Sequence, residues 1–212
     1  MDVVRFKRKP VMGIVRGLEK KSLKPLIDTV IDAGLETLEI TMNTKSAAGL
    51  IAGAVGYARG RLTIGAGTVL GMNDLKRALA SGATFIVMPV LVKDVIRFCG
   101  KKNIPVFPGA LTVQEIYTAW NAGATMVKVF PAQCFGPEYF RSIKGPLGSI
   151  SLMACAGVTP ANMKEYFSCG ASAVAIGGGV FKETWLAKRD FARIRRALDA
   201  YLRQLTIRSL VM

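Results

Sequence analysis

The sequence of 212 residues contains no histidine, and this absence excludes several kinds of catalytic site. Ser-His-Asp and Cys-His catalysis both need an imidazole base, and an aldolase that polarises its substrate with histidine-bound zinc needs imidazole ligands. Proton transfer in an active site of this chain must therefore fall to Glu, Asp, Lys, Tyr or Cys side chains. We expect neither a metal nor another cofactor.

The cysteines lack the spacing of a disulfide or metal motif. No C-x-x-C pair occurs among Cys99, Cys134, Cys155 and Cys169, and a chain of this length does not need disulfides for its stability. We interpret all four as reduced thiols, mostly in the core. Their number alone leaves a four-thiolate metal site open, although their spacing does not support one.

Long apolar runs are also missing. No run reaches the ~18 residues that cross a bilayer, and the charged N-terminus is unlike a signal peptide. The hydrophobic fraction of 51% is enough for a sizeable core. We expect one domain over residues 1–212, in the cytoplasm, with a basic N-terminal segment and a basic C-terminal helix. For the apolar tail at 210–212 the sequence suggests only packing on a neighbouring chain.

Acidic residues are scarce, with 14 Asp and Glu against 29 Lys and Arg, and the formal net charge is +15. This excess favours anionic partners such as a phosphorylated metabolite, nucleic acid or an anionic lipid surface. Much of it lies near the two ends of the chain, where a solvated basic face is the simplest interpretation. The sequence has no recognisable nucleic-acid-binding module and no aromatics interleaved with the cations, so we expect no nucleic-acid or membrane partner.

A four-residue motif with a central glycine recurs four times, and each copy precedes a short, mostly apolar run. Each glycine follows a stretch with helical spacing. This arrangement predicts a helix that ends at a left-handed glycine and leads directly into a buried strand. The copies lie at 32–35, 80–83, 121–124 and 168–171, and the predicted strands follow at 37–41, 84–88, 125–130 and 172–176.

Further apolar runs between these units predict four more strands, at 11–15, 62–66, 104–107 and 149–155. Helical periodicity is clearest at 20–33, 47–59, 73–80, 92–101 and 113–121. Strands and helices that alternate eight times predict a (β/α)₈ TIM barrel. An open doubly wound sheet is the alternative, but the first strand is not followed by the G-x-G-x-x-G turn that this fold usually carries.

Two charged residues lie inside predicted barrel strands. Lys128 is flanked by apolar residues in 126–130, and burial of an ammonium ion is costly, which favours the neutral amine that can attack a ketone. Glu39 has the strand parity of Thr37 and Thr41 and would face the barrel interior. Two interpretations stay open for each: Lys128 as a nucleophile or as an edge-strand lysine with its head in water, and Glu39 as a proton shuttle or as a buried partner of Lys128.

Substrate-binding candidates lie where strands end, because active sites of this fold are built at the C-terminal ends of the strands. Arg16 ends the first strand and suits a carboxylate or phosphate. Thr68 follows small residues that would let a ligand approach the backbone. Gly157, Gly177 and Gly178 would offer backbone N–H groups to a phosphate. A surface arginine, a plain turn and a flexible glycine loop are the structural alternatives.

In combination, these motifs resemble those of the 2-keto-3-deoxy-6-phosphogluconate/2-keto-3-deoxy-6-phosphogalactonate aldolase family, which are trimeric class I (Schiff-base) aldolases. The resemblance extends from Val11 to about the last helix. Six segments carry it in order: GIVRG at 13–17, EIT at 39–41, GAGTVL at 65–70, FPG at 107–109, VKVFP at 127–131 and GVTPAN at 157–162.

The resemblance implies that Lys128 forms the Schiff base with a 2-keto acid and that Glu39 moves protons during C–C cleavage. The implied reaction splits a 2-keto-3-deoxy-6-phospho-sugar acid, or 4-hydroxy-2-oxoglutarate, into pyruvate and an aldehyde such as glyceraldehyde 3-phosphate. The implied partners are a small anionic keto acid and further copies of the chain in a homotrimer. The implied substrate-binding residues are Arg16, Thr68, Pro89, Gly157, Gly177 and Gly178.

Four positions depart from the family pattern. Asn43 stands where phosphogluconate-type members have an arginine for the pyruvate carboxylate, while the phosphogalactonate type is similar to this chain. Cys155 replaces a threonine near the substrate's stereocentre, and Ala156 replaces a glycine. Gly179 replaces a serine, which leaves backbone donors and nearby cations to hold a phosphate.

Two other hypotheses remain beside the aldolase. A barrel isomerase or synthase would keep the phosphate site and use Lys128 as an electrostatic anchor. A basic nucleic-acid-binding protein would use the net charge of +15.

Overall fold

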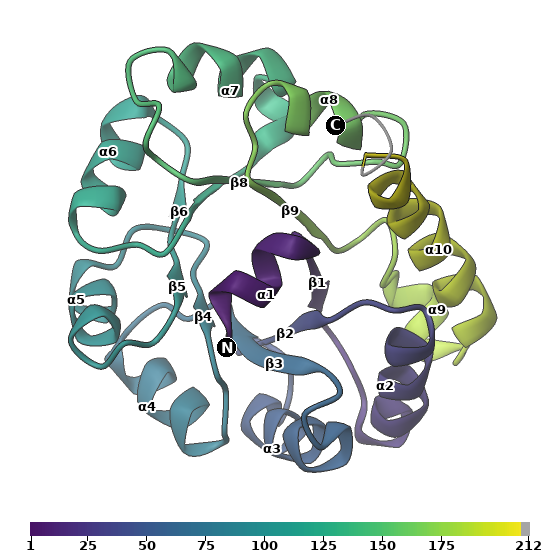
Figure 1. Ribbon diagram of the computed structural model, residues 1–212. Helices are drawn as coiled ribbons and strands as arrows, with labels where there is room; N and C mark the ends of the chain where they lie inside the picture. Colours follow the sequence, from purple (N-terminus) through teal and green to yellow (C-terminus); the bar gives the residue numbers. More distant parts are fainter. Residues whose placement is uncertain (209–212) are drawn as a thin grey trace.

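The computed structural model describes residues 1–208, so the apolar tail at 210–212 lies outside the described residues. The strands form one parallel sheet that wraps into a barrel, and helices surround it (Figure 1). The strand order is β5-β4-β3-β2-β1-β9-β8-β7-β6. β5 and β6, at the two ends of this order, are separated only by Pro108, which has no N–H for a ladder. They are two halves of one barrel strand, and the predicted TIM barrel is confirmed.

The strands match the predicted runs but are shorter in several places. Those that differ most are β4, β7 and β8, each of which is three residues shorter than its predicted run. The bounds are β1 Val11–Val15, β2 Thr37–Thr41, β3 Thr63–Gly67, β4 Ile86–Val87, β5 Val106–Phe107, β6 Gly109–Ala110, β7 Val127–Val129, β8 Leu152–Cys155 and β9 Ala173–Ile176.

The five helical segments singled out by their periodicity are all present, within one or two residues of the predicted bounds apart from a short 3₁₀ turn that opens the first of them. None of the helices in residues 1–208 is long and apolar enough to cross a membrane. The bounds are α1 Val3–Arg8, η1 Lys20–Ser22, α2 Leu23–Asp32, α3 Ala47–Ala58, α4 Met72–Ala80, α5 Lys93–Lys101, α6 Val113–Asn121, η2 Ala132–Cys134, α7 Pro137–Lys144, α8 Met163–Ser168, α9 Glu183–Ala187 and α10 Phe191–Arg208.

The glycine of each repeat has the predicted left-handed conformation. The φ angles are 83° at Gly34, 86° at Gly82, and 102° at both Gly123 and Gly170. At each of them the next N–H reaches back five residues to a helix carbonyl, as Leu35 N does to Val30 O at 3.1 Å. This is the hydrogen-bond pattern of a glycine-terminated helix, so the repeat ends four helices and starts four strands in the same way.

The N-terminal segment forms a helix that the sequence analysis treats only as a basic segment. α1 lies across the end of the barrel where the strands begin (Figure 1). Asp2 caps it by accepting a hydrogen bond from Arg5 N at 3.0 Å. Its single buried residue, Phe6, is 3% exposed and packs edge-to-face on Phe107, with ring centroids 6.0 Å apart. With one apolar anchor among cations, the segment shows no periodicity from which a helix could be predicted.

Two groups of side chains form the core. The larger one lies between the barrel and the outer helices. The smaller one fills the barrel, where Phe6 closes a set of interior side chains that includes Met12, Phe85, Phe107, Met126 and Met153. Because this filling occupies the end where the strands begin, the functional site is confined to the opposite, C-terminal end.

We predict that Phe6→Ala lowers the free energy of unfolding by about 3–5 kcal/mol, because it leaves a cavity under the aromatic rings of the interior. Urea denaturation followed by circular dichroism measures the change. Val4→Ala is the matched control, since Val4 is on the same helix and 65% exposed. Equal stability of the two variants would contradict the role assigned to α1.

Candidate active site

Lys128 lies in the barrel interior rather than on an edge strand. β7, which carries Lys128, pairs with β6 on one side and with β8 on the other. Lys128 is only 5% exposed. Its backbone N–H donates to Pro108 O at 2.8 Å. The amine Nζ is 5.1 Å from the centre of the Phe130 ring. The alternative of a lysine with its head in bulk water is therefore wrong.

Glu39 also faces the interior, as its strand parity predicts, and it is 1% exposed. A side chain at Gly67, on the neighbouring strand β3, would overlap the Glu39 carboxyl. At Gly65 the corresponding space is filled by the Phe85 ring. The small residues of β3 thus make room for two interior side chains. The interpretation that they let a ligand approach the backbone is wrong.

The Glu39 carboxyl is buried without the contacts that usually hold a carboxylate ionised. Its Oε2 atom has no hydrogen-bond partner, and no ion pair within 4.0 Å joins it to Lys128. Burial raises the pKa of Glu39 to about 7, although the positive charges of Lys128 and Arg16 oppose the rise. A carboxyl with this pKa can both accept and release a proton near neutral pH.

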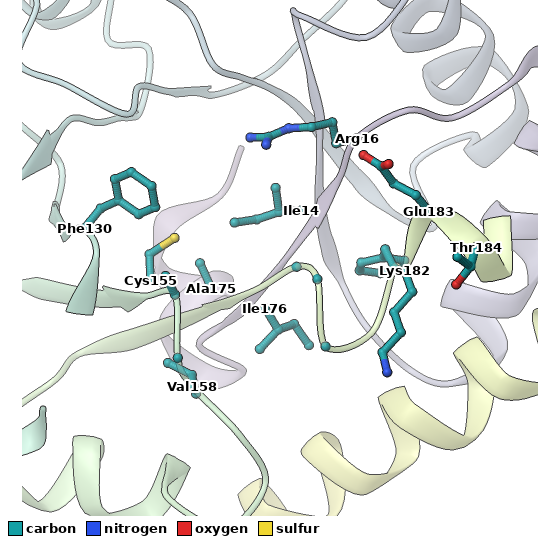
Figure 2. Close-up of a pocket in the computed structure, with 16 residues that line it drawn as sticks. Ile14, Arg16, Phe130, Cys155, Val158, Ala175, Ile176, Lys182, Glu183 and Thr184 are labelled. Atoms are coloured by element: carbon teal, nitrogen blue, oxygen red, sulfur yellow. The ribbon is translucent and has the colours of Figure 1, made fainter. Parts of the chain in front are cut away.

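Arg16 and Cys155 complete the polar surroundings of Lys128 and Glu39. Figure 2 shows the Arg16 side chain extending from the end of β1 above Ile14. Burial raises the pKa of the Cys155 thiol, the charge of Lys128 offsets part of that rise, Glu39 adds to the rise, and Arg16 opposes it. The thiol is therefore neutral and sits within the electrostatic reach of all three charged groups. The site combines a buried lysine, a titratable carboxyl and a thiol with Arg16 at its exposed end.

A cavity of about 530 Å³ opens at the C-terminal ends of the strands, next to these residues. Figure 2 shows its lining, which comes from the ends of β1, β7, β8 and β9 and from the start of α9. Two of the lining residues are neighbours of the buried pair. The Phe130 ring lies against the Lys128 amine, and the backbone of Ile14 is paired with that of Glu39 across β1 and β2. Neither Lys128 nor Glu39 lines the cavity itself, but residues that contact each of them do, so the cavity lies next to the buried lysine and carboxyl.

The structure brings four of the six predicted substrate-binding residues to this cavity, namely Arg16, Gly157, Gly177 and Gly178. Thr68 and Pro89 do not line it. Thr68 follows β3 with a left-handed backbone at φ 54°, and Pro89 follows β4. Both therefore lie at the C-terminal end of the barrel, after β3, which neighbours β2, and after β4, the next strand beyond it.

Three residues of the lining, Lys182, Glu183 and Thr184, are missing from the sequence predictions. They stand at the start of α9, after the turn at Gly177 and Gly178. Their only signal in the sequence is their place shortly after the glycines of the last strand. Polar residues in a connection carry no periodicity, so only the path of the chain shows which of them face the cavity.

The turn after β8 shows how one departure from the family pattern, Ala156, is accommodated. Ala156 and Gly157 both have positive φ, at 72° and 77°. A side chain at Gly157 would overlap Gln133, and Gly157 O accepts from Asn162 Nδ2 at 2.9 Å. The turn therefore keeps its shape with alanine at 156, at the cost of a left-handed non-glycine residue. Asn43, the departure on the second strand, is exposed.

The thiols do not form a metal site within the described part of the chain. Cys99, Cys155 and Cys169 are buried, Cys134 is exposed, and all four are free. Within residues 1–208, no three Cys, Asp or Glu side chains are grouped so that they could hold a metal ion. The four-thiolate alternative is wrong for these residues.

Comparisons with known proteins define the class as an aldolase. The family model described as "KDPG and KHG aldolase" matches residues 3–197. The 2-dehydro-3-deoxy-6-phosphogalactonate aldolase of Escherichia coli is 31% identical over 91% of this chain and 94% of its own. The 2-dehydro-3-deoxy-phosphogluconate aldolase of Pseudomonas aeruginosa is 31% identical over 88% of this chain and 84% of its own.

A solved structure, described as native KDPGal, superposes with a TM-score of 0.89 at 29% identity and covers 95% of this chain and 97% of its own. The chain belongs to the KDPG and KHG aldolase family. It is therefore an enzyme of the lyase class, and its fold is the barrel of the class I aldolases.

We predict that Glu39→Gln changes how stability depends on pH. In the wild type the folded state holds the Glu39 proton from the ordinary pKa of 4.5 up to about 7, so stability falls as the pH rises through this window. The glutamine variant has no such loss, and its free energy of unfolding should gain roughly 2–3 kcal/mol on the wild type between pH 5 and pH 8.

Urea denaturation at several pH values measures this difference. The control is Glu19→Gln, because Glu19 is exposed and paired with Lys21, and its difference from the wild type should stay flat above pH 5. If the free energy of unfolding of wild type and Glu39→Gln depended on pH in the same way, the pKa of Glu39 would not be raised to about 7 in the folded state.

Proposed function

We propose that this protein cleaves a 2-keto-3-deoxy-6-phospho-sugar acid of the gluconate or galactonate type, or 4-hydroxy-2-oxoglutarate, to pyruvate and an aldehyde, through an imine on Lys128. The observation that carries the proposal is the burial of Lys128 and Glu39 in one barrel interior, next to a cavity at the C-terminal ends of the strands. The relatives from E. coli and P. aeruginosa are named for the phosphogalactonate and phosphogluconate substrates, which supports this substrate class.

The proposed reaction begins when the Lys128 amine, after giving up its proton, attacks the C2 ketone, and the carbinolamine then loses water to give a protonated imine. Glu39, with its pKa of about 7, takes the proton of the C4 hydroxyl. The C3–C4 bond then breaks, its electron pair moves into the imine to form an enamine, and C4 becomes the aldehyde carbonyl. Protonation of the enamine at C3 and addition of water release pyruvate and restore the amine.

The cavity suits the two ends of such a substrate. Arg16 would bind an anionic group of the substrate, because a guanidinium pairs well with a carboxylate or a phosphate. Gly157, Gly177 and Gly178 would offer backbone N–H groups to the far end of the chain. Thr68 and Pro89 stay predicted substrate contacts, although neither lines the cavity.

The proposal predicts a covalent adduct on Lys128 when the protein is reduced with borohydride in the presence of pyruvate. Peptide mass spectrometry locates the adduct. Lys128→Met should abolish both the adduct and aldolase activity, while Lys101→Met, which alters an exposed lysine, should change neither. An isomerase or synthase that uses Lys128 only as an anchoring charge would give no adduct, and that result would end the proposal.

We also propose that the chain works as a homotrimer in the cytoplasm. The free state of all four cysteines supports a reducing compartment. Large apolar side chains are exposed beside neighbouring barrel strands, and a second copy of the chain would cover them. They are Leu70 after β3, Val90 after β4, Val113 and Tyr117 on α6, and Phe135 after β7.

Light scattering after size exclusion should therefore give the mass of three chains. Introducing charge with Val113→Asp and Tyr117→Asp together should reduce the mass to one chain, because burying two carboxylates in an apolar contact is costly. Val4→Asp is the control, since Val4 is exposed on the far end of the barrel. A monomeric wild type would contradict this assignment.

A further inference from the structure

After the glycine turn, the lining of the cavity includes one cation and one anion whose charged groups point in different directions. Lys182 and Glu183 both line it. The Lys182 ammonium is directed away from the cavity in Figure 2, and its Nζ lies 4.6 Å from the centre of the Trp185 ring. Its charge is thus used in a cation–π contact on the outer side.

The Glu183 carboxylate has the opposite orientation. Figure 2 shows it pointing to the side of the cavity on which Arg16 lies. It is close to the backbone of the β1 loop, because a Cβ atom on Gly17 would lie 3.8 Å from Glu183 Oε1. Among the side chains that the structure describes, none gives Glu183 a hydrogen bond or an ion pair. The carboxylate is exposed at the mouth of the cavity, where it can accept a hydrogen bond from a ligand.

Such an acceptor discriminates between the chemical groups that a sugar acid can carry at its far end. A hydroxyl group can donate to it, whereas a phosphate dianion has no proton to donate and is repelled by it. The other polar groups here, the backbone N–H groups of the glycine turn and the hydroxyl of Thr184, can serve either ligand. Glu183 is the one acidic residue among the described residues that line the cavity, whereas the cation Arg16 attracts an anionic group, so the charge of Glu183 is what disfavours a phosphate there.

We propose that Glu183 is a specificity-determining residue of this aldolase. It favours substrates whose far end carries free hydroxyl groups, and it weakens the preference for a phosphorylated end. The inference rests on the proposed function, since it concerns the far end of the keto acid whose near end is bound to Lys128. It adds that unphosphorylated 2-keto-3-deoxy sugar acids belong to the substrate range of this chain.

Steady-state kinetics with 2-keto-3-deoxygalactonate and its 6-phosphate, and with the corresponding gluconates, test the proposal. Glu183→Gln should raise the ratio of kcat/KM for the phosphorylated over the unphosphorylated acid by about five- to tenfold, the effect of one removed like charge in a partly solvated site. Glu183→Asp keeps the charge and should leave the ratio near that of the wild type. Lys182→Met, the matched control, should not lower it, because that ammonium faces away.

Calorimetric titration with inorganic phosphate gives a second readout that needs no turnover. Glu183→Gln should bind phosphate about five- to tenfold more tightly than the wild type. An unchanged kcat/KM ratio together with unchanged phosphate binding would overturn the inference, as would loss of phosphorylated-substrate activity in Lys182→Met alone. A missing pyruvate adduct on Lys128 would overturn the proposed function instead, and the phosphate titration would still decide the role of Glu183.

Discussion

The site depends on the fit of the Glu39 carboxyl against the bare backbone of Gly67. β2 and β3 are adjacent and parallel, and the missing side chain on one strand provides the space for the carboxyl on the other. In that space the carboxyl is away from water and Oε2 has no partner, which keeps its pKa near 7. Any side chain at Gly67 would push the carboxyl toward the cavity, where solvation would favour the ionised form. The proton affinity of one residue is thus set by the absence of atoms on its neighbour.

Much of the fold could be predicted because the repeated sequence motif reflects a repeated structural requirement. Each copy needs a left-handed glycine to end a helix, and the strand that follows must be apolar on both faces, so Gly34, Gly82, Gly123 and Gly170 mark the architecture directly. The interior position of Glu39 followed from strand parity, and the burial of Lys128 followed from its apolar neighbours. Both predictions depend only on residues within one strand, so they do not require knowledge of which distant segments meet.

The remainder could not be predicted because it depends on where distant segments meet. α1 buries one aromatic residue, Phe6, against Phe107 and pairs Arg5 with Glu36, and such contacts with distant residues leave no pattern in its own sequence. The role of the glycines of β3 depends on which side chains of other strands fill their space. Lys182 and Glu183 are adjacent in sequence, yet they face different sides of the chain in Figure 2. The net charge of +15 likewise says little about the cavity, whose lining holds both signs.

α1 and the aromatic side chains of the interior close one end of the barrel, and this closure determines the order in which products can leave. Because one end of the barrel is filled, ligands must enter and depart through the same mouth, at the C-terminal ends of the strands. In the proposed reaction, the fragment attached to Lys128 then sits behind the other. The aldehyde has to vacate the outer part first, and a new sugar acid has to wait until the three-carbon product has cleared the passage.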